Sequence, residues 1–167
     1  MNTIAKALIF TFLSLTALAA RAQSTFPNLA SSDDVESVYV SEAMLRMVGA
    51  SGGNITAGVN MPSKMINKIT SIEVYSCETP RSVKAAKSAV SSFIEKNPDT
   101  KLLVSVNDKS EKVNIYGVPN GKIYGSPNGK TVGYSKIIIC DSEPKEYDIV
   151  ILNGKFDSSD LGSITNM

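Results

Sequence analysis

The chain has 167 residues, a formal net charge of +1 and no histidine. Its length fits one domain with a sizeable buried core. The near-neutral charge argues against a nucleic-acid partner, because phosphate backbones select for clustered lysine and arginine. The lack of histidine excludes the usual Ser-His-Asp and Cys-His sites and the zinc sites that use histidine. We therefore expect no cofactor, no metal and no catalytic residues.

Residues 1–22 have the features of an export signal. A weakly basic start precedes the uncharged apolar run Ala7–Ala20, and Ala20-Arg21-Ala22 supplies the small residues that predict cleavage before Gln23. The run is shorter than the ~20 residues that a membrane-spanning helix needs. The alternative is an uncleaved N-terminal anchor. We expect residues 23–167, whose formal charge is −1 without Lys6 and Arg21, to be exported, soluble and without a transmembrane segment, in the periplasm or outside the cell.

Two segments carry helix signals. Asp33 and Glu36 have the spacing of a capping box, which predicts a helix that runs to Val48. Thr79 and Pro80 fit the N-cap and first position of a second helix. This helix has an apolar stripe formed by Val83, Ala86, Val90, Phe93 and Ile94.

The other apolar segments predict strands. Apolar and polar residues alternate, or short apolar runs occur, over residues 69–77, 101–107, 112–116, 135–140 and 147–152. Strands that follow one another, rather than alternating with helices, favour an α+β fold. We predict one α+β domain over residues 23–167, with a largely antiparallel sheet of four to five strands and two main helices packed on it.

The cysteines and methionines have structural roles as their main predicted functions, a disulfide or core packing. Cys77 and Cys140 end strand-like runs, and an even cysteine count in an oxidising compartment predicts one disulfide. It would close a loop of about 60 residues, worth roughly 4 kcal/mol. The alternative is two buried thiols that pack as small apolar groups. Four methionines lie on predicted inward faces and are expected to fill the core: Met44, Met47, Met61 and Met65. The alternative for these residues is a soft-metal site.

An eight-residue unit occurs twice in Ile115–Lys130, IYGVPNGKIYGSPNGK, and differs only at Val118 and Ser126. Each Pro-Asn-Gly favours a turn, so two turns predict a small meander with a short middle strand. Solenoid repeats need about three copies, so a local duplication that lengthens a protruding hairpin is the simpler alternative. The candidate binding residues on this hairpin, for sugars or peptides, are Tyr116, Asn120, Tyr124 and Asn128.

Three segments resemble a known family: Val35–Leu45 (VESVYVSEAML), Lys64–Glu78 (KMINKITSIEVYSCE) and Ile149–Ile164 (IVILNGKFDSSDLGSI). They are similar to the domain of unknown function 4252, a family of exported Bacteroidetes proteins. The resemblance implies a small exported protein of unknown activity, with no catalytic residues to transfer. Some members lie near envelope-signalling genes, which suggests a regulatory role. The doubled unit departs from the single hairpin turn that the family implies.

Carboxylate chemistry is the remaining catalytic option, because glycoside hydrolysis needs only two suitably spaced acids. The candidate acids, each of which also fits a cap or a solvated turn, are Asp33, Asp34, Glu36, Asp141 and Glu143. We expect a non-catalytic binding or interaction domain of the cell envelope, with an envelope or extracellular protein or glycan as partner. The alternatives are a periplasmic regulator in envelope stress or sigma-factor signalling, and a carboxylate-based hydrolase.

Overall fold

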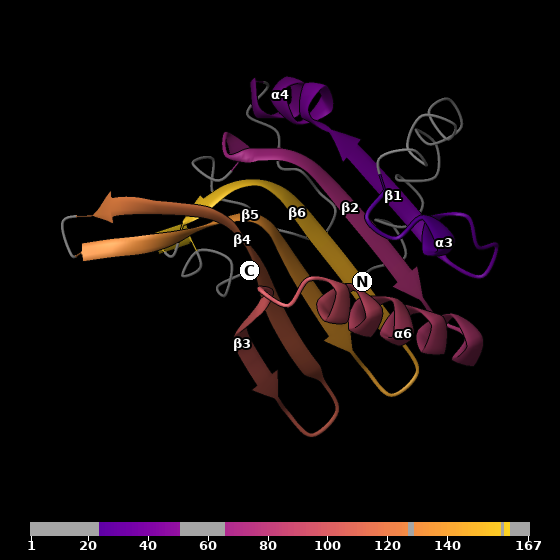
Figure 1. Ribbon diagram of the computed structural model, residues 1–167. Helices are drawn as coiled ribbons and strands as arrows, with labels where there is room; N and C mark the ends of the chain where they lie inside the picture. Colours follow the sequence, from indigo (N-terminus) through magenta and orange to yellow (C-terminus); the bar gives the residue numbers. More distant parts are fainter. Residues whose placement is uncertain (1–23, 51–65, 127–128, 158, 161–167) are drawn as a thin grey trace.

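The structure is a computed structural model that describes residues 24–50, 66–126, 129–157 and 159–160 (Figure 1). The predicted signal peptide, Met61, Met65 and Asn128 lie outside the described residues. Within this part of the chain, no helix is long and apolar enough to cross a membrane.

One antiparallel sheet of six strands organises the fold. The strands are β1 (Glu36–Ser41), β2 (Ile69–Cys77), β3 (Lys101–Asn107), β4 (Lys112–Ser126), β5 (Gly129–Ser142) and β6 (Tyr147–Asp157). Their order across the sheet is β1-β2-β6-β5-β4-β3, and every neighbouring pair is antiparallel. β1 and β3 are therefore the two edges, and β6 lies at the centre between β2 and β5 (Figure 1).

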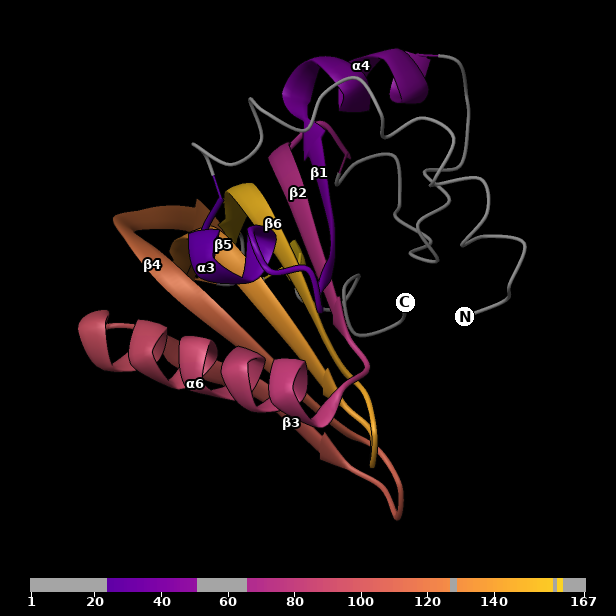
Figure 2. The same ribbon diagram turned by 90° about the vertical axis from the view of Figure 1, so that its right-hand side faces the viewer.

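The described helices are α3 (Pro27–Ala30), α4 (Glu42–Ala50) and α6 (Pro80–Lys96). α3 and α6 lie on the same side of the sheet, and α4 lies beyond the ends of β1 and β2 (Figure 2). α6 begins as its sequence predicts, because the Thr79 hydroxyl accepts from the backbone N–H of Ser82 and the Ser82 side chain accepts from the Thr79 N–H. Such reciprocal caps satisfy backbone donors that a helix start leaves free.

The predicted fold class of four to five strands with two main helices is wrong. The sheet has six strands, and α6 is the only helix of more than nine residues in the described part of the chain. The extra strand is β1, which occupies the first half of the helix predicted from Asp33 to Val48; α4 occupies the second half. Val38 and Val40 alternate along β1 opposite Val74 and Ile72 of β2. Pairing with β2 therefore overrides the capping-box pattern.

The same error misplaced the methionines of this segment. Met44 and Met47 are exposed on α4, so the prediction that they fill the core is wrong for both residues. Leu45 is the α4 residue that is fully buried. The β1–α4 junction rotates the helix relative to the single long helix that was expected, and a different side chain points inward.

Two apolar clusters lie on the two faces of the sheet. The cluster on the side of α3 and α6 includes Phe26, Val90 and Ile149, whereas the cluster on the opposite face includes Leu45, Ile137 and Leu152. On this opposite face, one continuous row of β-branched residues crosses all six strands: Val38, Val74, Val150, Ile139, Ile115 and Val104. Branched side chains pack well on a pleated surface. The row fixes the register, because a one-residue slip would turn these side chains to the other face.

The end of β6 approaches the chain just before β2 so closely that Gly154 has no room for a side chain. A Cβ added at Gly154 would lie 2.2 Å from the carbonyl oxygen of Lys68 and 2.9 Å from the Cζ atom of the buried Phe156 ring. The adjacent Lys155 N–H donates to that same Lys68 carbonyl at 2.9 Å. Glycine is therefore the residue that this contact between the two backbones requires.

We predict that Gly154→Ala lowers the free energy of unfolding by about 1–3 kcal/mol, the usual cost of overpacking. Backbone atoms of Lys68 would have to move to admit the methyl group. Urea unfolding of the variant and of Ser91→Ala, an exposed change on α6, measures the difference. An unchanged midpoint for Gly154→Ala would contradict the close approach.

Candidate functional site

The β4–β5 hairpin extends well past the rest of the sheet. β3 pairs with β4 only as far as Gly117, and β6 pairs with β5 only from Gly133 onward. We call residues 118–126 and 129–132 the outer hairpin. Among the described residues, their strand partners all lie on β4 and β5, and they project to one side of the molecule (Figure 1). In the described part of the chain, no third strand pairs with either edge of this element.

The first Pro-Asn-Gly of the doubled unit forms a bulge within β4. Pro119 pairs with Tyr134 and Ile123 with Val132, so three residues lie between the pairs on β4 and one on β5. Gly121 has a φ of 72°, and the Asn120 side-chain oxygen accepts from the Lys122 N–H at 2.9 Å. This local turn absorbs the extra residues. The predicted meander with a short middle strand does not form.

The second unit carries the chain to the end of the hairpin. Ser126 pairs with Gly129, so the strands reverse direction between them. Tyr124 lies opposite Thr131 in the backbone register. The two copies of one sequence unit thus occupy different places: one spans the sheet and a bulge, and the other spans the outer hairpin.

The structure does not bring all the predicted binding residues to one surface. Tyr116 is half-buried and packs against the core cluster beneath α6. Burial, and then the neighbouring Cys140, raise the pKa of the Tyr116 phenol. Asn120 is engaged in the bulge. Tyr116 therefore lies at the base of the hairpin and Asn120 lies in the β4 bulge.

A pair of exposed apolar residues marks the outer hairpin instead. Ile123 is 66% exposed and its register partner Val132 is 39% exposed. Ile115, the residue that matches Ile123 in the first unit, is only 4% exposed. The duplication has placed a core-type residue on the surface. Sequence reasoning missed this pair, although the identity of Ile115 and Ile123 within the repeat was a usable signal.

Both cysteines are free thiols in the structure and are buried. Cys77 is on β2 and Cys140 on β5, and β6 lies between these strands. Strands two positions apart are separated by roughly 9.6 Å, beyond the ~7 Å between Cα atoms that a disulfide spans. A bond between them would need backbone movement. Burial raises the pKa of each thiol to about 11, so neither is a reactive thiolate near neutral pH.

A buried carboxylate, Glu73 on β2, forms the polar centre of the α6 side. Glu73 is only 2% exposed. It accepts from the Thr25 N–H at 2.6 Å, the Thr25 hydroxyl at 2.7 Å, the Tyr75 hydroxyl at 2.7 Å and the Asn153 amide at 3.0 Å. Burial raises the pKa of Tyr75, which keeps its phenol protonated as a donor. Four donors satisfy a carboxylate that would otherwise be costly to bury.

Lys136 supplies the nearby positive charge. Its Nζ donates to the Thr25 hydroxyl and lies 5.9 Å from the centroid of the Phe93 ring. Burial lowers the pKa of Lys136, and the Glu73 carboxylate opposes that effect. The Thr25 hydroxyl therefore links the amine to the carboxylate. The Glu73 carboxylate and the Lys136 amine both contact Thr25. We therefore interpret the cluster as a structural network that holds the N-terminal segment.

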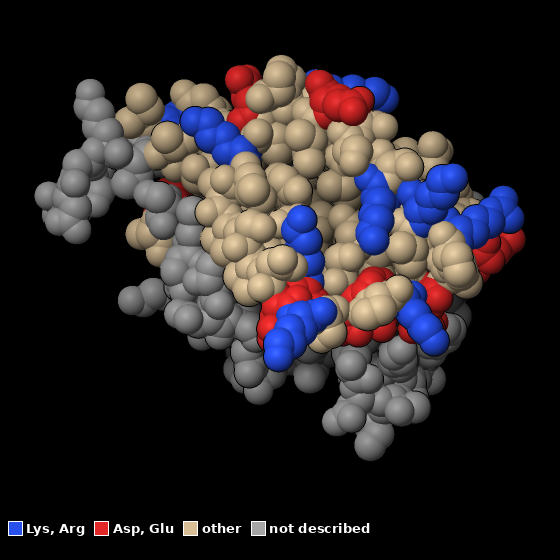
Figure 3. Space-filling view, turned by 90° about the horizontal axis from the view of Figure 1, so that it is seen from below, with Lys and Arg blue, Asp and Glu red and all other residues tan. Residues whose placement is uncertain are grey.

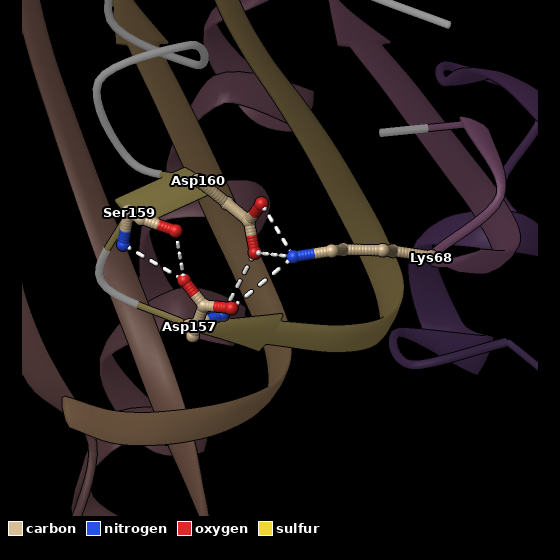
Figure 4. Close-up of polar contacts among 4 residues, drawn as sticks. All are labelled: Lys68, Asp157, Ser159 and Asp160. Carbon is tan, nitrogen blue, oxygen red and sulfur yellow. Dashed lines mark hydrogen bonds and ion pairs between the residues drawn. The ribbon is translucent and has the colours of Figure 1, made fainter. Parts of the chain in front are cut away.

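A second polar cluster fastens the end of β6 (Figure 4). The Lys68 ammonium contacts Asp160 at 2.7 Å and Asp157 at 3.1 Å, and the Asp157 N–H donates to Asp160 at 2.8 Å. Although desolvation opposes it, the pKa of Lys68 is raised by the two carboxylates. Hydrogen bonds from Ser159, helped by Lys68, lower the pKa of Asp157. Lys68 and Asp157 therefore stay charged near neutral pH. The cluster is an ion-paired contact that holds the segment after β6 against the start of β2.

The acids proposed for hydrolysis fall into two groups, one on β5 and the β5–β6 turn and the other at the start of β1. Asp141 and Asp148 lie directly opposite each other on β5 and β6. Burial raises the pKa of Asp141, and so do the neighbouring carboxylates of Glu111, Glu143, Asp148 and Glu146. Asp33, Asp34 and Glu36 are exposed near the start of the edge strand β1, which β2 and β6 separate from β5. No group of three metal-binding side chains occurs among the described residues.

The surface of the described residues includes two open hollows of substantial volume. One, of about 570 Å³, has hydroxyl and amide groups from the ends of β1, β2 and β6, including Ser41, Thr70 and Asn153. The other, of about 780 Å³, lies between α6 and the β5–β6 turn, where the Lys87 Nζ is 5.3 Å from the centroid of the Tyr147 ring. Seen from below, this end of the molecule carries lysines and acids side by side (Figure 3). The charged side chains that line this second hollow are Lys84, Lys87, Lys145 and Glu78.

The fold and these sites define a small antiparallel-sheet domain with one long covering helix and a projecting hairpin. The chain belongs to the family described as domain of unknown function DUF4252, whose model matches residues 29–164. This match confirms the family resemblance of the sequence. Comparison with curated proteins gave no match, and neither did comparison with solved structures.

We predict that Thr25→Val lowers the free energy of unfolding by about 1–3 kcal/mol, because it leaves Glu73 and Lys136 short of a buried partner. The substitution keeps the shape of the side chain. Thr70→Val, an exposed change on β2, is the matched control and should cost far less. Chemical denaturation measures both. Equal effects would show that the Thr25 hydroxyl contributes nothing specific.

We predict that Asp141→Asn stabilises the protein at pH 7 by about 0.2–1 kcal/mol, the range for like charges opposite each other on neighbouring strands. A raised carboxyl pKa means that the folded state binds the proton more tightly, so ionisation above pH 3.8 weakens folding. The gain should therefore disappear in acid, where Asp141 is protonated in both states. Thermal unfolding at pH 3 and pH 7 measures this, with the exposed Asp33→Asn as control. A gain that persists at pH 3 would rule out this electrostatic cause.

Proposed function

We propose that this chain is an exported, non-catalytic binding domain of the bacterial cell envelope, and that the outer hairpin contacts its partner. The charge-free apolar run and small-residue cleavage pattern of residues 1–22 support export. Family membership is compatible with this function and identifies no activity. The partner is an envelope or extracellular protein, or a glycan.

The exposure of Ile123 is the observation that carries the binding role. A repeated unit presents isoleucine to the core in its first copy and to solvent in its second. Exposed apolar side chains on a projecting element are typical of contact surfaces. Among the described residues, β3 and β6 do not pair with the hairpin beyond Gly117 and Gly133, so its two backbone edges carry no other strand there.

Deletion of one unit provides a direct test. Removal of Ile123–Lys130 joins Lys122 to Thr131 and retains the Asn120-Gly121 turn, where Gly121 already has a positive φ. The shortened hairpin should therefore close at this turn and leave the Pro119–Tyr134 pair in place. The core of the domain, which lies on the other side of that pair, should stay folded.

We predict that crosslinked pull-down from an envelope extract of the native host recovers a partner with the full protein and loses it with the deletion. Ile123→Ser should weaken capture about tenfold, as expected when a contact residue worth more than ~1 kcal/mol is lost. Lys122→Ser, an exposed change one residue away, is the matched control. Circular dichroism confirms folding of each variant. Equal capture by the full and shortened proteins would exclude the outer hairpin as the contact surface.

A further inference from the structure

The two edges of the sheet differ in how they are protected. α3 and α4 both pack beside β1, whereas β4 is the only described element that β3 contacts extensively. The outer side of β3 faces away from the rest of the molecule (Figure 1). An edge strand presents a row of backbone N–H and C=O groups that another strand can pair with. β3 is thus the edge that is open to pairing.

The side chains of β3 reinforce this difference. Leu102 is 55% exposed and Val106 is 54% exposed. Leu102 pairs with Tyr116 and so lies on the α6 side, while Val106 pairs with Val113 and lies on the opposite face. β3 contains no proline, and its one charged residue is Lys101 at its start. Both faces of this edge therefore offer apolar surface beside the free backbone groups.

The charges at the ends of the strands favour a second copy of this chain as the occupant. Lys101 begins β3 and Asp108 directly follows it, so antiparallel self-pairing would bring opposite charges together. β1 has Glu36 at its start and Glu42 just after its end, so the same pairing there would bring acids together. Like charges opposite each other destabilise paired strands.

We propose that two copies of this protein associate by antiparallel pairing of their β3 strands about a two-fold axis at Ser105, which joins the two six-stranded sheets into one. Val104 then lies opposite Val106 of the second copy. The bulge at Leu103 shifts the register by one residue, so Lys101 lies opposite Asp108 of the second copy. Each of these positions pairs residues that point to the same face.

This register also continues an apolar surface across the interface. Val104 ends the row of β-branched residues that crosses the face opposite α6. Val106 of the second copy would stand next in that row. A shift of one residue from this register would set polar Ser105 beside a valine and turn the side chains of the two copies to opposite faces.

The seven residues of β3 make a small interface. It buries less than the ~800 Å² per partner of a standard stable complex. We therefore expect weak, concentration-dependent association rather than an obligate dimer. This association does not depend on the outer hairpin, which lies at a different part of the sheet.

Cysteine crosslinking of the full chain tests the register. In Ser105→Cys the two introduced thiols face each other across the axis, at the ~4.5–5.5 Å between Cβ atoms of paired strand residues. In the matched variant Asn107→Cys they lie on the same face but ~13 Å apart along the strands. The native cysteines are buried and should not compete. Mild oxidation should give at least about tenfold more covalent dimer from Ser105→Cys, because disulfides require close Cβ atoms.

A second measurement separates self-association from a chance crosslink. Sedimentation equilibrium of Val106→Lys should show at least about a tenfold weaker dimer, since the change places a charge in the apolar contact. Ser91→Lys, an exposed position on α6, should associate as the unaltered protein does. Equal or absent crosslinking of the two cysteine variants would overturn the proposal. So would association that Val106→Lys leaves unchanged.

Discussion

The buried carboxylate of Glu73 constrains how the rest of the domain is arranged. A charge on a central part of a sheet face must find several donors, because its transfer out of water otherwise costs several kcal/mol. Those donors come from β2 itself, from β6 through Asn153, and from Thr25 near the start of the described chain. Departure of the N-terminal segment would remove the two donors that Thr25 supplies to this carboxylate. One acid thus ties together parts of the chain that are 48 and 80 residues apart.

The apolar packing on the two faces builds on this arrangement. Once Thr25 is held, Phe26 lies edge-on to both Tyr75 and Phe93 at centroid distances of 5.8 Å, and so connects β2 to α6. The opposite face is held differently, by a row of β-branched side chains within the sheet and by Leu45 from α4. Both faces have an apolar cluster, and the α6 side also contains the Glu73 network. The Lys68 cluster holds the end of β6 against the residue before β2.

Sequence signals predicted the elements whose formation depends mainly on neighbouring residues along the chain. Thr79, Pro80 and the apolar stripe of α6 all agree with one helix, and the structure has it. The prediction for β1 failed because its sequence satisfies a helix cap and a strand alternation at once, and only its partner β2 decides between them. The donors of Glu73 could not be foreseen either, because Thr25 and Asn153 become neighbours of Glu73 only after the sheet has formed. In the doubled unit, the turn residues were recognised, but whether Pro-Asn-Gly reverses a strand or bulges it depends on the pairing of β5.

The even length of the repeated unit has a consequence for how this protein can change. Side chains on a strand alternate between faces, so an insertion of eight residues preserves which residues point to which face. Four residues on each strand of a hairpin correspond to roughly 13 Å of length. Gain or loss of a unit would therefore alter how far the domain reaches from its sheet without rewriting any core position. The length of the hairpin and the stability of the core therefore depend on different residues, so either property can change without the other.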